Sequence, residues 1–146
     1  MKKDKKTIIL IIIAIILIAI DQGLKLLGNI IIYEEVNNEV GHNSIVSYVI
    51  TNFIVLGIII KFFINQKDRM GTNLVIIISF LLAGGISNLI DKIFRGKIVN
   101  YIKLFNLPAI NLAYLFIIFG WIGLASIFAW NTYKEIKEKQ NKQDVK

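Results

Sequence analysis

The sequence lacks most of the residues on which common catalytic and metal sites depend. Its 146 residues include no cysteine, one histidine and one proline. Without cysteine, the chain has no disulfide, no thiol nucleophile and no cysteine-ligated metal. His42 stands in a polar stretch with no second histidine to share an ion, so we expect it to be solvated. We predict no metal site.

Acidic residues are also scarce, and their scarcity is local. The chain has 10 acidic and 17 basic residues, for a net charge of +7, and no acid separates Asp91 from Glu135. A positive balance can indicate nucleic-acid binding. Here, however, the cations flank apolar segments, where they set membrane orientation and contact anionic headgroups. We therefore expect membrane lipid as a partner, and no nucleic acid.

Hydrophobic residues make up 55% of the chain, and its mean hydropathy is +0.65. They form blocks near the roughly 20 residues that a helix needs to cross a bilayer. The sequence therefore predicts an all-α membrane protein with four transmembrane helices and one domain, residues 1–133, followed by a charged cytoplasmic tail, residues 134–146. The predicted spans cover about residues 7–32, 45–64, 73–91 and 109–130, and Pro108 suits the first turn of the last one.

The distribution of lysine and arginine predicts the orientation. Basic residues gather in residues 2–6, in residues 67–69 and in the tail, whereas the first loop, residues 28–44, holds three glutamates and no cation. This asymmetry places both termini in the cytoplasm. The loop from Lys92 to Pro108 breaks the rule, because its four cations lie outside. Those cations either contact headgroups or substrate, or they are a simple exception.

Polar residues inside the spans are predicted to share one depth. At 1.5 Å per residue, Asp21 lies about 21 Å along its helix from Thr7, and Asp91 lies about 27 Å from Asn73. Both approach the outer boundary of the hydrocarbon, where buried ionisable groups usually mark a site. We expect the layer near the outer leaflet to contain Asp21, Gln22, Lys25, Asn88, Asp91, Lys92 and Asn111, with Tyr114 beside them.

The same residues also have a purely structural explanation. Asp21 and Lys25 are spaced i to i+4 and can neutralise each other. Asn88 and Asp91 can cap or hydrogen-bond neighbouring helices. Pattern alone leaves both explanations open.

Three motifs resemble those of a known family, the lipoprotein signal peptidases (signal peptidase II). These are four-span intramembrane aspartyl proteases that remove the signal peptide of diacylglyceryl-modified bacterial prolipoproteins. The family's D-Q-x-x-K, its G-N-x-I-D-R-x-x-x-G-x-V-D-F and its F-N-x-A-D elements resemble "DQGLK" (21–25), "AGGISNLIDKIFRGKIVNYI" (83–102) and "INLAY" (110–114). Their order and the predicted topology also agree. The resemblance implies a multi-pass protein of the bacterial cytoplasmic (plasma) membrane.

The sequence departs from the family pattern at the positions that carry the catalytic chemistry. The resemblance places the catalytic aspartates at positions that hold Asn100 and Tyr114. An aspartyl protease needs two carboxyl groups that share a proton, which an amide and a phenol cannot replace at neutral pH. In addition, Lys92 stands for an arginine, and the N-x-G element of the first loop is blurred in "NNEVGHNS", residues 37–44.

The sequence therefore favours a catalytically inactive homologue that binds a lipidated or hydrophobic peptide in an outer-leaflet groove, as an accessory or immunity protein, with other membrane proteins as further partners. One alternative is an active peptidase whose catalytic pair has moved to Asp21 and Asp91. Another is a small transporter or channel component whose polar layer lines a water path. The aspartyl mechanism uses no cofactor, and none is expected.

Overall fold

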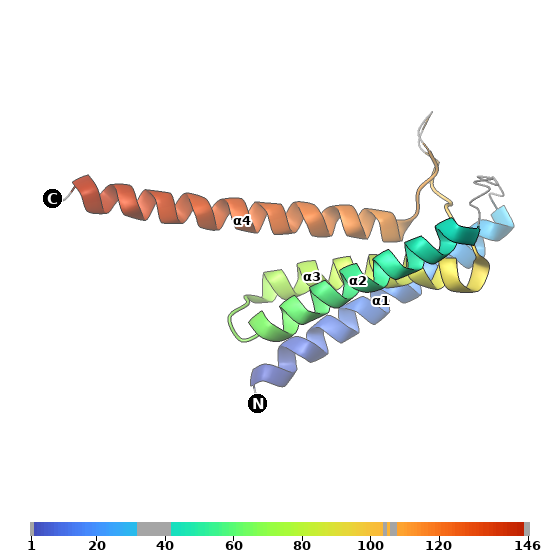
Figure 1. Cartoon of the computed structure of the whole chain (residues 1–146), viewed down its shortest axis with the longest axis horizontal. Coiled ribbons are helices and arrows are strands. Elements are labelled where there is room, and N and C mark those ends of the chain that lie inside the picture. The colour runs from blue at the N-terminus through green and yellow to red at the C-terminus, as the bar shows by residue number, and fades with distance from the viewer. Residues whose placement is uncertain (1, 32–41, 104, 106–107, 145–146) are drawn as a thin grey trace.

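A computed structural model of the chain describes residues 2–31, 42–103, 105 and 108–144. It contains four helices, namely α1 (Lys2–Ile31), α2 (His42–Gln66), α3 (Thr72–Arg95) and α4 (Leu112–Asp144) (Figure 1). All four are long and apolar enough to cross a membrane. The prediction of an all-α membrane protein with four transmembrane helices is confirmed.

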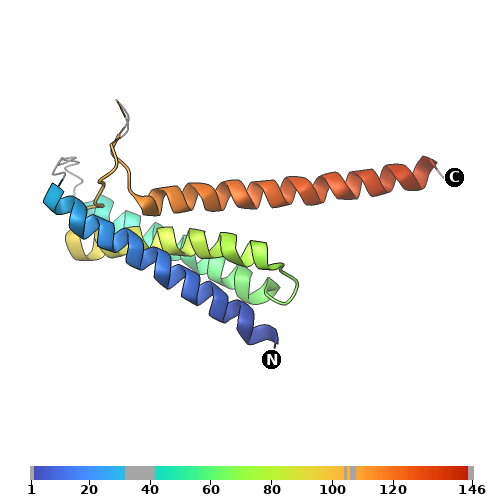
Figure 2. The same ribbon diagram turned by 180° about the vertical axis from the view of Figure 1, so that it is seen from behind.

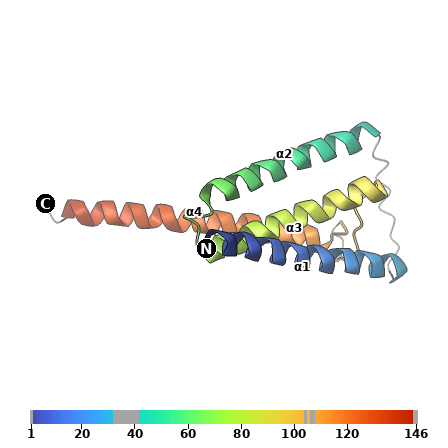
Figure 3. The same ribbon diagram turned by 90° about the horizontal axis from the view of Figure 1, so that it is seen from below.

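Helix α3 is the centre of the bundle and packs against each of the other three helices (Figure 3). About 61% of the most apolar stretch of α3 is buried, against 17% or less of the corresponding stretch in the other spans. Val75 and Ile78 of α3 meet Leu10 of α1 and Leu56 of α2 in one apolar cluster. The outer three helices leave rows of isoleucine, leucine and phenylalanine exposed, as suits surfaces solvated by lipid chains.

Helices α3 and α4 approach closely because glycine lies at their contact. A Cβ atom added to Gly84 would overlap the carbonyl oxygen of Ala113, and one added to Gly120 would overlap the Leu81 side chain. Small residues at such contacts let helix backbones meet in a membrane, where van der Waals packing replaces the hydrophobic effect. This contact fixes where the start of α4 lies against α3.

Helix α4 begins at Leu112, three residues after the predicted boundary. Ile110 pairs with Ile102 in an antiparallel bridge, with N–H···O distances of 2.9 and 2.8 Å, so Pro108 precedes the helix instead of lying in its first turn. The cap is Asn111, whose Oδ1 accepts a bond from the Tyr114 amide at 2.8 Å. At its other end, α4 continues through the predicted tail to Asp144 and projects beyond the bundle (Figure 2).

Two of the basic segments meet at one end of the molecule. Lys6 Nζ donates to the carbonyl oxygens of Lys67 at 2.9 Å and Met70 at 2.6 Å, which ties the start of α1 to the turn between α2 and α3. The four helices alternate in direction, so the amino and carboxyl termini lie at this same end (Figure 1). We call it the inner end and the opposite one the outer end. The predicted glutamate-rich loop, with Glu34, Glu35, Glu39 and most of the blurred N-x-G element, lies outside the described residues.

Candidate functional site

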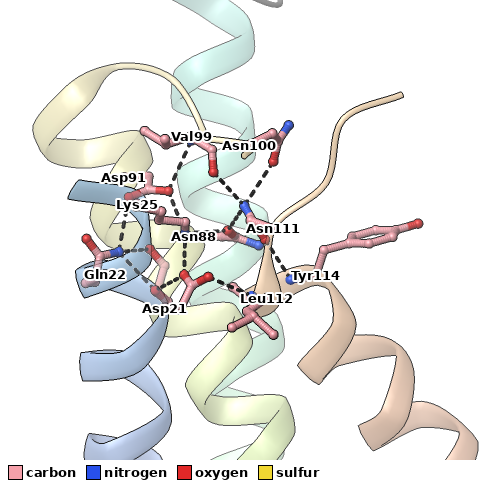
Figure 4. Close-up of polar contacts among 12 residues, drawn as sticks. Asp21, Gln22, Lys25, Asn88, Asp91, Val99, Asn100, Asn111, Leu112 and Tyr114 are labelled. Atoms are coloured by element: carbon pink, nitrogen blue, oxygen red, sulfur yellow. Dashed lines mark hydrogen bonds and ion pairs between the residues drawn. The ribbon is translucent and has the colours of Figure 1, made fainter. Parts of the chain in front are cut away.

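Charged side chains from α1 and α3 meet at the outer end of the bundle (Figure 4). Asp21, Lys25 and Asp91 are each 0% exposed. Lys25 Nζ lies 2.5 Å from Asp21 Oδ2 and 2.7 Å from Asp91 Oδ2. A single ammonium group therefore stands between the two carboxylates. The structural explanation of the Asp21–Lys25 spacing holds, and it extends to Asp91.

Arg95 supplies a second cation. Its guanidinium contacts Asp91 Oδ1 from one turn further along α3 and also donates to Gln22 Oε1 at 2.9 Å. Asp21, Lys25, Asp91 and Arg95 form what we call the ion cluster, with two acids and two bases. This balance matters because buried charges are tolerated only when paired and hydrogen-bonded.

Uncharged donors bond to the same carboxylate oxygens as the two cations do. Ser87 Oγ donates to Asp21 Oδ2 at 2.6 Å, and Gln22 Nε2 donates to Ser87 Oγ at 2.9 Å and to Asp91 Oδ1 at 3.1 Å. The Val99 amide donates to Asp91 Oδ2 at 3.2 Å. Asp21 Oδ1 accepts from the Tyr101 hydroxyl and the Ala113 amide, so each carboxylate oxygen in the cluster has a partner, as expected for charged groups removed from water.

Asp21 also holds the start of α4. The Ala113 amide donates to Asp21 Oδ1 at 3.0 Å, while the Leu112 amide donates to the Tyr101 hydroxyl at 3.2 Å. These amides belong to the first turn of α4, where backbone N–H groups have no acceptor within their own helix. A carboxylate at this position also complements the positive end of the helix dipole. Asp21 therefore links α1 to both α3 and α4.

Tyr101 belongs to the segment between α3 and α4, and its hydroxyl donates to Asp21 Oδ1 at 3.2 Å. Burial raises the pKa of the Tyr101 phenol from 10 to about 12. Because both the unfolded and the folded value lie far above physiological pH, the phenol stays protonated throughout that range and can donate to Asp21. Above pH 10, the unfolded chain would lose this proton first and stability would fall.

A second group of amides borders the ion cluster. Asn111 Nδ2 lies 3.0 Å from Asn88 Oδ1, from the Val99 carbonyl oxygen and from Asn100 Oδ1. Lys25 Nζ reaches the same Asn88 oxygen at 3.2 Å. Asn100 therefore acts as an acceptor for the residue that caps α4, and the amides join the loop after α3 to the cluster (Figure 4).

Two of the predicted residues lie apart from this network. Lys92 is nearly buried, and its Nζ lies 5.7 Å from the centre of the Tyr48 ring on α2. Tyr114 contributes its backbone amide, but its side chain points away from the cluster and is 48% exposed (Figure 4). The contacts of Lys92 and Arg95 give a local role to two of the four cations that break the positive-inside pattern.

Sequence reasoning missed three side chains of the network. Ser87 and Arg95 lie four residues before and after Asp91, so the i to i+4 rule could have found them. Tyr101 carried no such signal. Its position depends on the bridge between Ile102 and Ile110, which pairs residues across a turn.

Together these features define a multi-span membrane protein whose first, third and fourth helices are joined by a buried polar network near one membrane face. Comparison with known proteins identifies its family. The sequence model of signal peptidase (SPase) II matches residues 29–130. A lipoprotein signal peptidase of Caldicellulosiruptor bescii is 33% identical over 103 residues, which cover 69% of each chain. The chain belongs to the signal peptidase II family and is a multi-pass protein of the bacterial inner membrane.

Other relatives match over shorter regions. A lipoprotein signal peptidase of Halalkalibacterium halodurans is 33% identical over 70 residues, covering 45% of this chain and 44% of that protein. One of Rickettsia conorii is 40% identical over 65 residues, covering 42% of this chain and 32% of that protein. The chain thus matches less than half the length of these two relatives.

A solved structure shares the fold. A bacterial membrane enzyme determined by the in meso method at 1.9 Å resolution superposes with a TM-score of 0.71 at 22% identity. The superposition covers 82% of this chain and 92% of that one. The likeness extends to the bundle as a whole.

Proposed function

We propose that this protein is a catalytically inactive member of its family that binds a lipidated or hydrophobic peptide at the outer leaflet, in an accessory or immunity role. One observation carries the proposal. The two carboxylates near the outer boundary in the described chain, Asp21 and Asp91, share the Lys25 ammonium. Meanwhile, the positions that the resemblance assigns to the catalytic pair hold Asn100 and Tyr114.

The chemistry of aspartyl proteolysis explains why this matters. One carboxylate must take a proton from water while its partner, a carboxylic acid, protonates the substrate carbonyl. Asp21 and Asp91 share a cation instead of a proton, and both are fully buried, so neither can meet water and a peptide carbonyl together. This arrangement counts against a catalytic pair moved to these two residues.

The outer end instead presents aromatic surface. Phe94 is 81% exposed, Phe105 is 92% exposed and Tyr114 is about half exposed. Aromatic side chains offer large apolar contact area, and tyrosine adds a polar tip suited to the membrane boundary. A ring at position 114, where the resemblance expects a carboxylate, suits an acyl chain or an apolar peptide side chain better than it suits hydrolysis. A lipidated signal segment and a hydrophobic peptide antibiotic both fit this description.

We expect the purified full-length chain in detergent micelles to bind a diacylglyceryl-modified prolipoprotein peptide saturably and without cleaving it. Fluorescence anisotropy with a labelled peptide measures the affinity. Tyr114→Ala should weaken binding about fivefold to tenfold, because truncating an aromatic contact of this size costs about 1–1.4 kcal/mol. Tyr133→Ala is the matched control, since Tyr133 is exposed on the same helix at the inner end.

The control variant and the peptide without its lipid show whether binding is specific to the outer end and to the lipid. Tyr133→Ala should bind like the parent chain, and the peptide without its lipid should bind more weakly. Equal affinity of the Tyr114→Ala and parent chains would show that the outer-end aromatic surface is not the binding site. If no peptide bound saturably, the proposal that this chain binds a peptide would be wrong.

A further inference from the structure

A pocket of about 470 Å³ opens at the inner end, far from the ion cluster. The end of α2, the following turn, the start of α3 and a late turn of α4 surround it. Part of its wall is apolar and part is polar. The apolar side includes Phe62, Leu74 and Ile127, and the polar side includes Gln66, Arg69 and Asn131.

The depth of the pocket places it at the membrane boundary. Asn131 lies about 29 Å along α4 from Leu112, close to the thickness of about 30 Å of a hydrocarbon core. The turn that carries Arg69 is also the one that Lys6 holds through the carbonyl oxygens of Lys67 and Met70. The pocket therefore lies where inner-leaflet headgroups would reach the helices.

The electrostatics of the pocket favour an anion. Among the described residues that line the pocket, Arg69 is the one with an ionisable side chain, and it is exposed. Lys67 lies in the same turn, and Lys134 follows Asn131 by one helical turn. Asp68 adds a negative charge to the turn but does not line the pocket. A guanidinium with neighbouring side-chain amides offers the planar donors that recognise phosphate oxygens.

The apolar side of the pocket indicates that the phosphate belongs to a lipid. Phe62, Leu74 and Ile127 would contact hydrocarbon, which a free phosphate ion does not carry. Basic pockets between transmembrane helices at the cytoplasmic face bind anionic lipid headgroups. We propose that this pocket binds one anionic phospholipid of the inner leaflet. Its phosphate would lie at Arg69, and the upper part of its acyl chains would lie against the apolar wall.

Native mass spectrometry of the full-length protein tests this proposal. The protein is titrated in micelles with phosphatidylglycerol, with phosphatidylcholine of the same acyl chains, and with glycerophosphoglycerol, which has the headgroup alone. We expect one preferentially retained phosphatidylglycerol per chain. Arg69→Gln should lower its affinity about fivefold, as expected for one cation near a lipid headgroup. Ile127→Trp, which fills the apolar side without changing charge, should also lower it.

The control for Arg69→Gln is Lys67→Gln, which makes the same change in charge two residues away, outside the lining of the pocket. It should lower the affinity less than Arg69→Gln does, because Lys67 does not line the pocket. The proposal is overturned if Arg69→Gln binds phosphatidylglycerol normally, or if Lys67→Gln loses as much, which would mean diffuse surface attraction. It is also overturned if glycerophosphoglycerol binds as tightly as the lipid, because the pocket would then take a free phosphate ester.

Discussion

Replacing Lys25 with methionine is expected to lower the free energy of unfolding by about 3–5 kcal/mol, because breaking a buried ion pair leaves its partner uncompensated. The effect should lie at the upper end of this range. Lys25 contacts two fully buried carboxylates, and without the ammonium Asp21 and Asp91 would face each other with only Arg95 to balance them. Unfolding of the purified protein in mixed micelles, followed by circular dichroism as SDS is added, measures the change.

Two further variants make this result specific. Lys61→Met alters an exposed lysine of α2 and should change stability by no more than about 0.5 kcal/mol. Asp21→Asn combined with Lys25→Met leaves the Asp91–Arg95 pair balanced, so the double variant should be more stable than Lys25→Met alone. A Lys25→Met protein within 1 kcal/mol of the parent would mean that the ion cluster does not hold the helices together.

Gly84→Val is the second change with a large expected effect. It should lower the free energy of unfolding by about 3 kcal/mol. Overpacking a tight contact usually costs 1–3 kcal/mol, and the upper value applies here because the first obstacle is backbone. The new Cβ would overlap the carbonyl oxygen of Ala113 and come within 2.7 Å of Ile117 Cγ1. Helix α4 would have to move away from α3, and its first turn would leave Asp21. The same unfolding titration reports the loss.

Gly57→Val is the matched control. It makes the same substitution in a transmembrane helix, but a Cβ added to Gly57 would meet no heavy atom within 4 Å. The difference between the two variants therefore isolates the α3–α4 contact from the intrinsic helix preference of glycine and valine. Equal losses at positions 57 and 84 would show that close approach of these helices contributes nothing.

Depth explains why much of this network was predictable. An acid or base inside a span must face protein, and residues at equal depth on different helices can then meet. Counting from the span ends brought Asp21 and Asp91 to one level, and the structure places both with Lys25. The i to i+4 spacing correctly gave the first ion pair. It could not show that the same lysine also bridges to α3, since helix rotation is set by packing.

Other features depended on information that spacing does not contain. Lys92 follows Asp91 directly, and neighbouring residues of a helix do not share a face. Periodicity therefore argued against its place in the site, and it lies over Tyr48 instead. The start of α4 was misplaced because Ile110 is held by its bridge to Ile102. Pairing across a turn cannot be read from the residues next to Pro108.

The proposal that this chain does not cleave prolipoproteins is tested most directly by a cleavage assay. The full-length protein in micelles is incubated with a diacylglyceryl-modified prolipoprotein, beside the lipoprotein signal peptidase of Caldicellulosiruptor bescii, and released signal peptide is followed by mass spectrometry. We predict no product from this chain under conditions in which the relative converts its substrate. Product that forms with the parent chain, and vanishes in a folded Asp91→Asn variant, would contradict the account.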